Sequence, residues 1–278
     1  MDFTVVLKQL DATIWDSRIK LVRHADSRFD LDRILKSGFF PEYEARQSRP
    51  VFHGVDYIIS FFGERGTRSR FLGCSRIRQQ SEGSKPWPSG YPYPDMNPGG
   101  FHYDLELLPQ FDEMRDRLVI DWGNATRSWA QHLRPKELLE IRPKGFVTEF
   151  PGFDEAMLEF QQLDAIVRNP DANGVWFRTL SSVAGVYLIV DTETGNQYVG
   201  SAHGAEGIFG RWAQYARSKH GGNKRLVELL REHPERWRRF QFSILRTLPK
   251  TMTAAEVIEV ESLKKRKLGS RAFGLNSN

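Results

Sequence analysis

The chain has 278 residues, 40% of them hydrophobic and 12% aromatic, and carries a formal net charge of +5. This length favours two domains, and the composition supplies ordinary hydrophobic cores, which argues against a largely disordered chain. The single cysteine, Cys74, excludes an intrachain disulfide framework and a multi-cysteine zinc finger. No signal peptide and no apolar run of membrane-spanning length can be read, so we expect a cytoplasmic protein without a membrane partner.

The positive charge is concentrated in the last third of the chain. Residues 181–278 contain 16 Lys and Arg against 9 Asp and Glu, a balance of +7, whereas residues 1–180 have a balance of −2. A basic segment of this kind attracts a polyanion such as DNA or RNA, although a solvated basic helix face gives the same count.

Residues 1–150 predict a strand-rich domain within an overall α+β fold. A helix is expected over Leu31–Ser37. Runs of β-branched and aromatic residues predict strands at Phe3–Leu7, Val55–Phe62, Arg70–Ile77, Phe101–Leu107, Leu118–Trp122 and Leu138–Ile141. Five or six short strands favour a compact β-barrel or a curved sheet with helical decoration. We expect this domain to direct the chain to the site where it acts.

Between Ser81 and Gly100, five prolines alternate with Trp87, Tyr91 and Tyr93. Proline lacks the N–H of a central strand, so a surface loop that covers a sheet edge is favoured over a loop whose aromatics stack on bases. A cluster further along contains Trp122, Arg127 and Trp129. Core packing is the favoured interpretation of this cluster, and a pocket that reads modified bases or a protein partner is the alternative.

Residues 151–182 predict a helical connector. Apolar residues recur at helical spacing between Phe153 and Val167, and the turn signals Asn169-Pro170-Asp171 follow. A second short helix is expected from Trp176 to Val183. The chain is therefore divided into a domain at 1–150, the connector at 151–182 and a domain at 183–278.

The last domain begins with a predicted hairpin. Gly185–Val190 and Gln197–Gly200 form its strands, with a turn between them. A loop of two or four residues would put Tyr187 and Tyr198 on the same face of this hairpin. Two strand tyrosines on one face are more often packing residues than catalytic residues.

Three helices and one strand are expected to follow. In a helix over Ile208–Lys219, Arg211 and Tyr215 are four residues apart and share a face. A short helix then runs through Leu226 and Leu230, and alternation predicts a strand over Phe240–Leu245.

The final helix opens with a capping box formed by Thr253 and Glu256. Its buried stripe is expected to contain Val257, Val260, Lys264 and Leu268, and Glu261 falls inside this stripe. A carboxylate on a core-facing line needs a cation, which could be Lys264, Arg211 or a bound metal. A structural ion pair is the alternative to a functional site.

These residues resemble the signature of the GIY-YIG nucleases. The matching positions are Gly185-Val186-Tyr187 and Tyr198-Val199-Gly200, with valine in place of isoleucine in both triplets. The resemblance continues through Arg211 with Tyr215, His220, Glu261 and Asn276, and it is greatest to the homing-endonuclease and restriction-enzyme branches. It implies a small α/β module with a three-stranded antiparallel sheet flanked by helices, and a metal-dependent DNA endonuclease of restriction, defence or mobile-element origin.

The resemblance also implies roles for the individual side chains. Glu261 would hold one Mg²⁺ or Mn²⁺, and Arg211 would bind a phosphate oxygen. Tyr187 would act as the general base, with help from Tyr198, Tyr215 or His220, and Asn276 would complete the site or cap the terminal turn. We expect Lys264 to face inward, whereas Lys224, Arg225, Lys265, Arg266 and Lys267 would bind the nucleic-acid backbone.

A non-cleaving nucleic-acid-binding protein that retains the nuclease fold is the second hypothesis. DNA is the expected partner, and the sequence leaves RNA open. One site per chain cuts one strand at a time, so cleavage of both strands would need a homodimer or two successive nicks.

Overall fold

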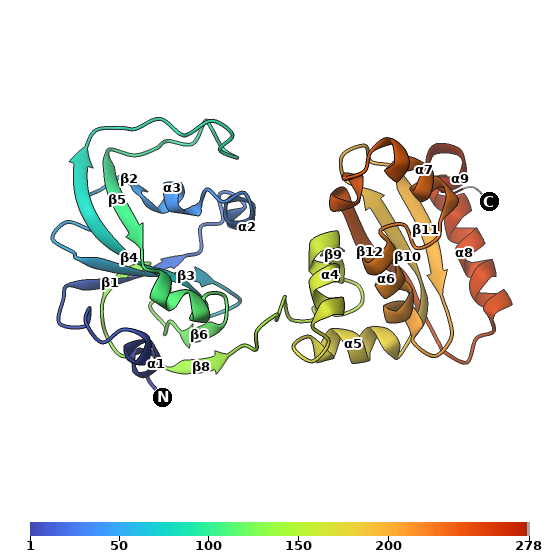
Figure 1. The fold of residues 1–278 in the computed structure, drawn as a ribbon, viewed down its shortest axis with the longest axis horizontal. Coiled ribbons are helices and arrows are strands. Elements are labelled where there is room, and N and C mark those ends of the chain that lie inside the picture. Colours follow the sequence, from blue (N-terminus) through green and yellow to red (C-terminus); the bar gives the residue numbers. More distant parts are fainter. Residues whose placement is uncertain (277–278) are drawn as a thin grey trace. The chain divides into compact units, whose positions relative to one another are not determined.

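A computed structural model describes residues 1–276 of the chain. Contacts divide the chain into two compact units, Met1–Arg142 and Pro143–Asn278, and each is described by itself (Figure 1). Within the described residues, no helix combines the length and the apolar character that crossing a lipid bilayer requires.

The first unit is rich in strands, as the sequence predicts. Its elements in chain order are α1 (Phe3–Leu10), β1 (Ile19–His24), α2 (Leu31–Lys36), α3 (Phe40–Glu44), β2 (Arg46–Gln47), β3 (Tyr57–Gly63), β4 (Arg68–Glu82), β5 (Phe101–Leu107), the 3-10 helix η1 (Pro109–Met114), β6 (Leu118–Asp121), β7 (Ala130–His132) and β8 (Leu138–Ile141). The main sheet has the order β2-β5-β4-β3-β1-β7, and β6 and β8 extend it from β4. The long strand β4 is the central strand of this sheet, because it pairs with β3, β5 and β6.

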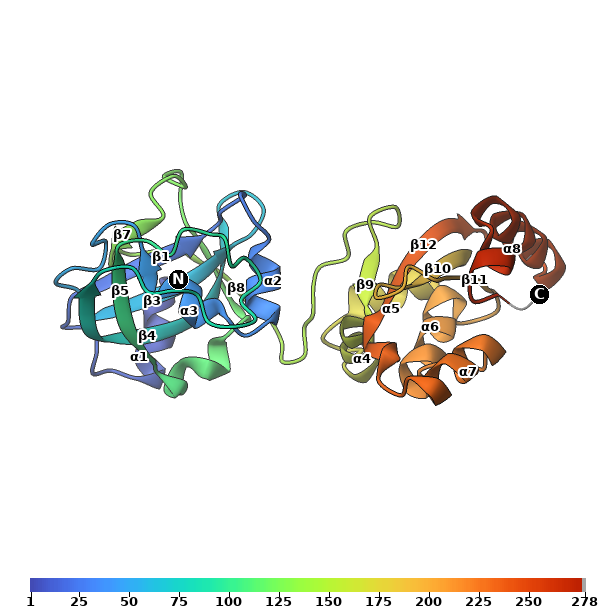
Figure 2. The ribbon, with the colours of Figure 1, turned by 90° about the horizontal axis from the view of Figure 1, so that it is seen from above.

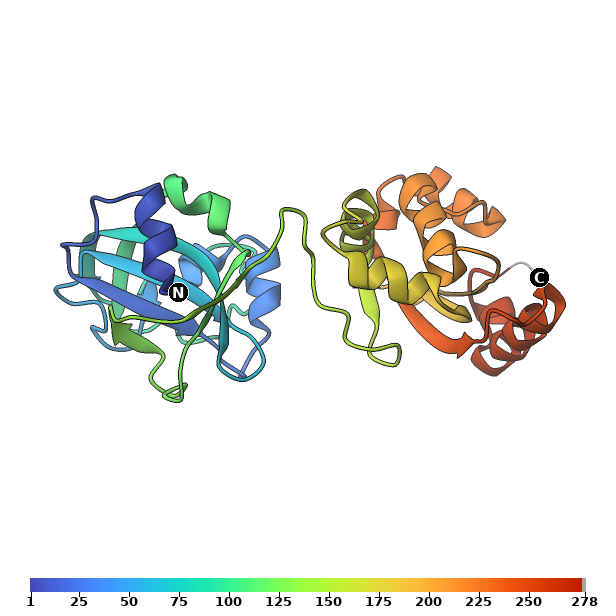
Figure 3. The ribbon, with the colours of Figure 1, turned by 90° about the horizontal axis from the view of Figure 1, so that it is seen from below.

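The segment predicted as a strand at Phe3–Leu7 is instead the helix α1. The carboxylate of Asp2 accepts a hydrogen bond from the Thr4 N–H at 2.8 Å and so caps the helix. Phe3 and Leu7, which are four residues apart, are both fully buried. The β-branched run between them favoured a strand, but the cap and the helical spacing of the two buried residues decide the local structure. Figure 3 shows α1 beside η1 on one face of the sheet.

An aromatic cluster forms the core under α1. The ring of Phe61 makes edge-to-face contacts with Phe3, Phe71 and Trp122, at centroid distances of 5.8 to 6.0 Å. Trp122 is fully buried, so core packing is the correct interpretation for this tryptophan. Trp129 is 38% exposed and lies outside this core.

The second unit contains a four-stranded antiparallel sheet. Its elements are β9 (Met157–Glu159), α4 (Phe160–Arg168), α5 (Gly174–Ser181), β10 (Ala184–Asp191), β11 (Gln197–Ala202), α6 (Gly207–Ser218), α7 (Lys224–Glu232), the 3-10 helix η2 (Arg236–Arg239), β12 (Phe240–Leu248), α8 (Ala254–Leu268) and α9 (Ser270–Phe273). The strand order is β11-β10-β12-β9, so the three predicted strands are joined by a fourth.

The fourth strand comes from the segment expected to be the connector. The helix predicted from Phe153 begins only at Phe160, because the preceding residues pair with β12, with Leu158 opposite Phe242. The Glu159 N–H donates to the side chain of Gln162 at 3.0 Å, which fixes the start of α4. Residues 157–181 therefore pack as part of the second unit.

Helices cover both faces of this sheet. Figures 2 and 3 show α6 on one side of the sheet and α8 on the other. Alternate residues of β10 separate accordingly: Tyr187 packs with Trp212 of α6, whereas Val186 packs with Val257 of α8. Strand β11 lies at the edge of the sheet, between the two helices.

Candidate active site

The β10–β11 hairpin brings two tyrosines to the α6 face of the sheet. Tyr187 pairs with Gly200, and Tyr198 pairs with Ile189. The rings of Tyr187 and Tyr198 lie 6.5 Å apart, and Tyr215 of α6 lies 6.0 and 6.3 Å from them. All three rings are buried, and we call them the tyrosine cluster.

Two glycines make room for this cluster. A Cβ at Gly200 would lie 2.6 Å from Cζ of Tyr187 and closer still to its hydroxyl oxygen. A Cβ at Gly221 would lie 2.5 Å from Cε1 of Tyr215, and the backbone of Gly221 has a φ of +56°. The glycine of Tyr198-Val199-Gly200 therefore has a steric reason, because the phenol of Tyr187 occupies the space of its missing side chain.

Arg211 joins the phenols of Tyr187 and Tyr215 into one hydrogen-bonded network. Its Nε donates to the hydroxyl of Tyr187 at 3.2 Å, and its Nη2 donates to that of Tyr215 at 3.4 Å. The two hydroxyls lie 3.2 Å apart. The guanidinium also lies 4.9 Å from the centre of the Tyr215 ring, and Nη1 donates to Gln214 at 2.5 Å. The half-buried guanidinium is therefore held in one orientation.

Burial controls the protonation of these phenols. It raises the pKa of Tyr187 well above its ordinary value, and the neighbouring Tyr198 raises it further, whereas Arg211 lowers it. Burial also raises the pKa of Tyr215. Both phenols are therefore neutral in this structure, and Arg211 alone does not give Tyr187 the lowered pKa that its predicted role as general base requires.

Glu261 lies on the other side of the sheet. Its Oε2 accepts a hydrogen bond from the hydroxyl of Ser201, and the ammonium of Lys265 lies 2.5 Å from its Oε1. The cation that reaches the carboxylate is Lys265, at the i+4 spacing, and not Lys264 or Arg211, which were expected as alternatives to a bound metal. Lys265, predicted to bind nucleic acid, is instead buried in this ion pair. Leu268, predicted to be buried, is 41% exposed.

The edge strand β11 separates the two groups. Gly200 contacts the tyrosine cluster, and the next residue, Ser201, binds Glu261 on the opposite face. Among residues 1–276 no hydrogen bond or ion pair links Glu261 to Tyr187 or Arg211. The structure thus brings Tyr187, Tyr215 and Arg211 together on one face of the sheet. Glu261 lies on the opposite face, beside β11.

Glu261 is the carboxylate at this sheet edge that could bind a metal ion, but it meets the requirements of such a site only in part. No group of three His, Cys, Asp or Glu side chains suited to a metal ion occurs in the described part of the chain. Mg²⁺ is often held by one or two carboxylates together with water and substrate phosphates, so a single Glu261 is sufficient in principle. Both of its oxygens already have partners, so a metal would have to displace the ammonium of Lys265.

Asn276 holds the C-terminal segment to the edge strand. Its Oδ1 accepts from the Val199 N–H at 2.9 Å, and its Nδ2 donates to the Val199 carbonyl at 2.8 Å. The Leu275 N–H donates to the carbonyl of Gln197 at 2.8 Å. Asn276 is fully buried, so this amide extends the hydrogen bonding of the sheet and closes the terminal turn.

The remaining predicted residues lie around α7 and the end of α8. His220 is half-buried, and its Nδ1 accepts from the Gly222 N–H at 3.0 Å. The Arg225 guanidinium donates to the Gly274 carbonyl at 2.7 Å, so it supports the C-terminal segment. Lys224, Arg266 and Lys267 are exposed, as nucleic-acid contacts would require.

Sequence reasoning missed two partners in this region, Ser201 and Gln214. Ser201 follows Val199 on the face of β11 that packs against α8, so a hydroxyl interrupts an apolar line. That interruption beside a core-facing Glu261 was a readable signal. Gln214 offered none, since an exposed glutamine on a helix is ordinary.

Three comparisons place this chain beside known proteins. No protein-family model matches the chain, and no curated protein is similar to it. Among solved structures, 34% of the chain is similar, with 26% sequence identity and a TM-score of 0.28, to the catalytic domain of the intron endonuclease I-TevI in a mutant form, and equally to the catalytic domain of the homing endonuclease I-TevI. The matches cover 94% and 96% of those two chains.

Proposed function

We propose that the second unit is a metal-dependent endonuclease that hydrolyses phosphodiester bonds of DNA. The observation that carries this proposal is Arg211, a guanidinium fixed by two buried phenols on the α6 face of the sheet. The ordered resemblance to the GIY-YIG nucleases supports it further.

Arg211 retains capacity to bind a phosphate. A guanidinium has five N–H donors, and three of them are used by Tyr187, Tyr215 and Gln214. One N–H remains on each Nη, and this pair suits two oxygens of a phosphate group. Because the phenols already orient the guanidinium, little conformational entropy would be lost when the phosphate binds.

Glu261 is the residue that would hold Mg²⁺ or Mn²⁺, after release from Lys265. Such an ion would neutralise charge on the phosphoryl oxygens and lower the pKa of a water molecule. The phenol of Tyr187 would hold the attacking water by a hydrogen bond, and the hydroxyl of Tyr215 would orient Tyr187 through their mutual hydrogen bond. The exposed Lys224, Arg266 and Lys267 would contact the DNA backbone.

A plasmid-nicking assay tests this function. Supercoiled DNA is incubated with the full chain and Mg²⁺, and with the variants Glu261→Gln and Glu259→Gln. We expect nicking by the wild type and by Glu259→Gln, whose side chain is exposed on the same helix, and a loss of about 10²–10³-fold for Glu261→Gln. Accumulation of nicked circles before linear DNA would show that one chain cuts one strand at a time.

The competing function is nucleic-acid binding without cleavage. The ion pair of Glu261 with Lys265 and the raised pKa of Tyr187 favour this alternative. Wild-type protein that binds the plasmid but never nicks it, with either Mg²⁺ or Mn²⁺, would refute the nuclease proposal.

A further inference from the structure

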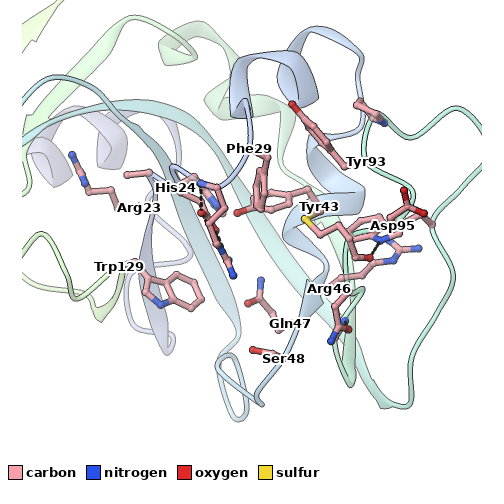
Figure 4. A pocket seen from close by; sticks show the side chains of 18 of the residues that line it. Arg23, His24, Phe29, Tyr43, Arg46, Gln47, Ser48, Tyr93, Asp95 and Trp129 are labelled. Atoms are coloured by element: carbon pink, nitrogen blue, oxygen red, sulfur yellow. Dashed lines mark hydrogen bonds and ion pairs between the residues drawn. The ribbon is translucent and has the colours of Figure 1, made fainter.

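A large pocket lies in the first unit, which the nuclease proposal leaves unexplained. Its volume is about 1100 Å³, slightly above the usual range of about 300–1,000 Å³ for small-molecule sites. Four segments that are distant in sequence form its walls: 23–29, 43–48, the proline-rich loop at 87–99, and 126–129. Figure 4 shows the side chains that line it.

Aromatic side chains face each other across this pocket. Trp129 lies on one side, and Phe29 and Tyr43 lie on the other (Figure 4). Phe29 and Tyr43 pack edge to face at 5.7 Å, which fixes their orientation. Trp129 is 38% exposed, and its indole packs edge to face with Phe52 at a centroid distance of 6.5 Å. A planar group between these walls would cover apolar surface that is now open to water.

The proline-rich wall of the pocket is held rigidly. Trp87 stacks on Tyr91 with ring centres 3.9 Å apart and an interplanar angle of 6°. The Arg46 guanidinium lies 4.8 Å from the Trp87 ring and donates to the Pro86 carbonyl at 2.9 Å. The loop aromatics thus stack on one another, and a ligand would meet a largely preformed wall.

Polar groups lie between the aromatic walls. Gln47 donates from Nε2 to the Glu44 carbonyl at 2.9 Å, which orients its amide at the pocket (Figure 4). His24 is buried and lies 2.9 Å from the buried carboxylate of Glu44. An oriented amide between aromatic faces suits the hydrogen-bonding edge of a heterocyclic base.

The charge of the lining selects the kind of ligand. Four arginines and two aspartates line the pocket: Arg23, Arg28, Arg46, Arg127, Asp26 and Asp95. Arg28 pairs with Asp26 and Arg46 pairs with Glu42, so Arg23 and Arg127 supply the excess of positive charge. This excess of positive charge favours a ligand with an anionic group and disfavours a cation such as a methylated lysine, which aromatic walls alone would accept. Exposed Arg127 belongs to the same wall segment as Trp129 and lies two residues before it.

We propose that this pocket binds a nucleotide, with its base stacked on Trp129 opposite Phe29 and Tyr43, its hydrogen-bonding edge at Gln47, and its phosphate near the arginines. The ligand is either a free nucleotide or a nucleotide turned out of a DNA strand, since both present the same base and phosphate. This inference concerns the first unit and does not depend on cleavage by the second.

Two binding measurements on the full chain in EDTA distinguish the sources. The first titrates the four deoxynucleoside monophosphates by calorimetry. The second follows the fluorescence of a 2-aminopurine placed opposite an abasic site in a DNA duplex, which rises when the base leaves the stack. Base stacking on an aromatic side chain predicts that Trp129→Ala weakens binding by about 5- to 150-fold. Leu139→Ala is the control, since Leu139 is 40% exposed in the same unit and does not line the pocket.

The outcomes separate cleanly. Monophosphate binding that Trp129→Ala weakens supports a free nucleotide, and a 2-aminopurine signal that the same variant abolishes supports a base turned out of DNA. The proposal is overturned if neither probe binds, if Trp129→Ala binds like the wild type, or if a trimethyl-lysine peptide binds in their place. Because EDTA prevents cleavage, an inactive second unit would not alter these results.

Discussion

Replacing Gly200 with alanine adds a methyl group at the point where the hairpin meets the tyrosine cluster. Its Cβ would lie 2.6 Å from Cζ and 2.9 Å from Cε2 of Tyr187, and nearer still to the hydroxyl oxygen. Carbon atoms pack at about 3.5–4.0 Å, so the phenol would have to move by roughly 1 Å. Tyr187 is fully buried against Trp212 and Tyr215, so it has no free space to enter.

The expected cost has two parts. Overpacking in a filled core costs about 1–3 kcal/mol. Moving the hydroxyl also lengthens its 3.2 Å hydrogen bonds to Arg211 and Tyr215, which contribute about 1 kcal/mol each, and weakening both by half costs about 1 kcal/mol more. We therefore expect Gly200→Ala to lower the free energy of unfolding of the second unit by about 2–4 kcal/mol. Nicking should fall as well, because Arg211 loses a support.

Native-state hydrogen exchange of the β10 and β11 amides measures this change without interference from the first unit. Gly100→Ala in the first unit is the control for the added methyl group, measured at the neighbouring β5 amides: this glycine also has an ordinary φ, and no atom lies within 4 Å of its missing Cβ. The control should shift stability by no more than about 0.5 kcal/mol. Wild-type protection and wild-type nicking in Gly200→Ala would refute the steric explanation for this glycine.

Three further predictions concern Asn276, the ion pair of Glu261 with Lys265, and the buried Lys136, whose ammonium donates to the Trp122 carbonyl. Asn276→Ala leaves the buried N–H and C=O of Val199 unpaired, so hydrogen exchange at β11 should show a loss of about 1–3 kcal/mol, and unchanged protection would contradict this. Burial lowers the pKa of Lys136 to about 8, so stability should rise with pH from about 8 towards 10.5 and lose that rise in Lys136→Met, as followed by Tm against pH. Lys265→Met frees an oxygen of Glu261 and should lower the Mg²⁺ concentration for half-maximal nicking by about 3–10-fold; an unchanged requirement would show that the ion pair does not compete with the metal.

Local patterns predicted the hairpin and its tyrosines, because side-chain direction along a strand has a period of two residues. The same period fixes Tyr187 and Tyr198 on one face. It could not show which helix covers which face, and so it could not show that Glu261 meets Ser201 on the other side of β11. On α8, Val257 and Glu261 face inward as predicted, but further along the helix Lys265 is buried where Lys264 was expected.

The nucleotide pocket lay beyond sequence reasoning for a different reason. Its walls come from four segments spread over more than one hundred residues, and each segment alone looks like an ordinary loop or strand end. The cluster of Trp122, Arg127 and Trp129 in the sequence indicated part of this pocket. Its two tryptophans differ in the structure, because Trp122 packs in the core and Trp129 lines the pocket. Only the tertiary arrangement distinguishes them.

The pairing of Leu275 and Asn276 with β11 also bears on how this protein behaves in concentrated solution. An exposed edge strand has a row of unpaired backbone donors and acceptors. A strand of another molecule can pair with this row, which leads to aggregation. The C-terminal segment shields this row at Gln197 and Val199, where association between copies would otherwise begin. A truncation before residue 275, or a fusion that pulls this segment away, would expose these backbone groups and promote aggregation.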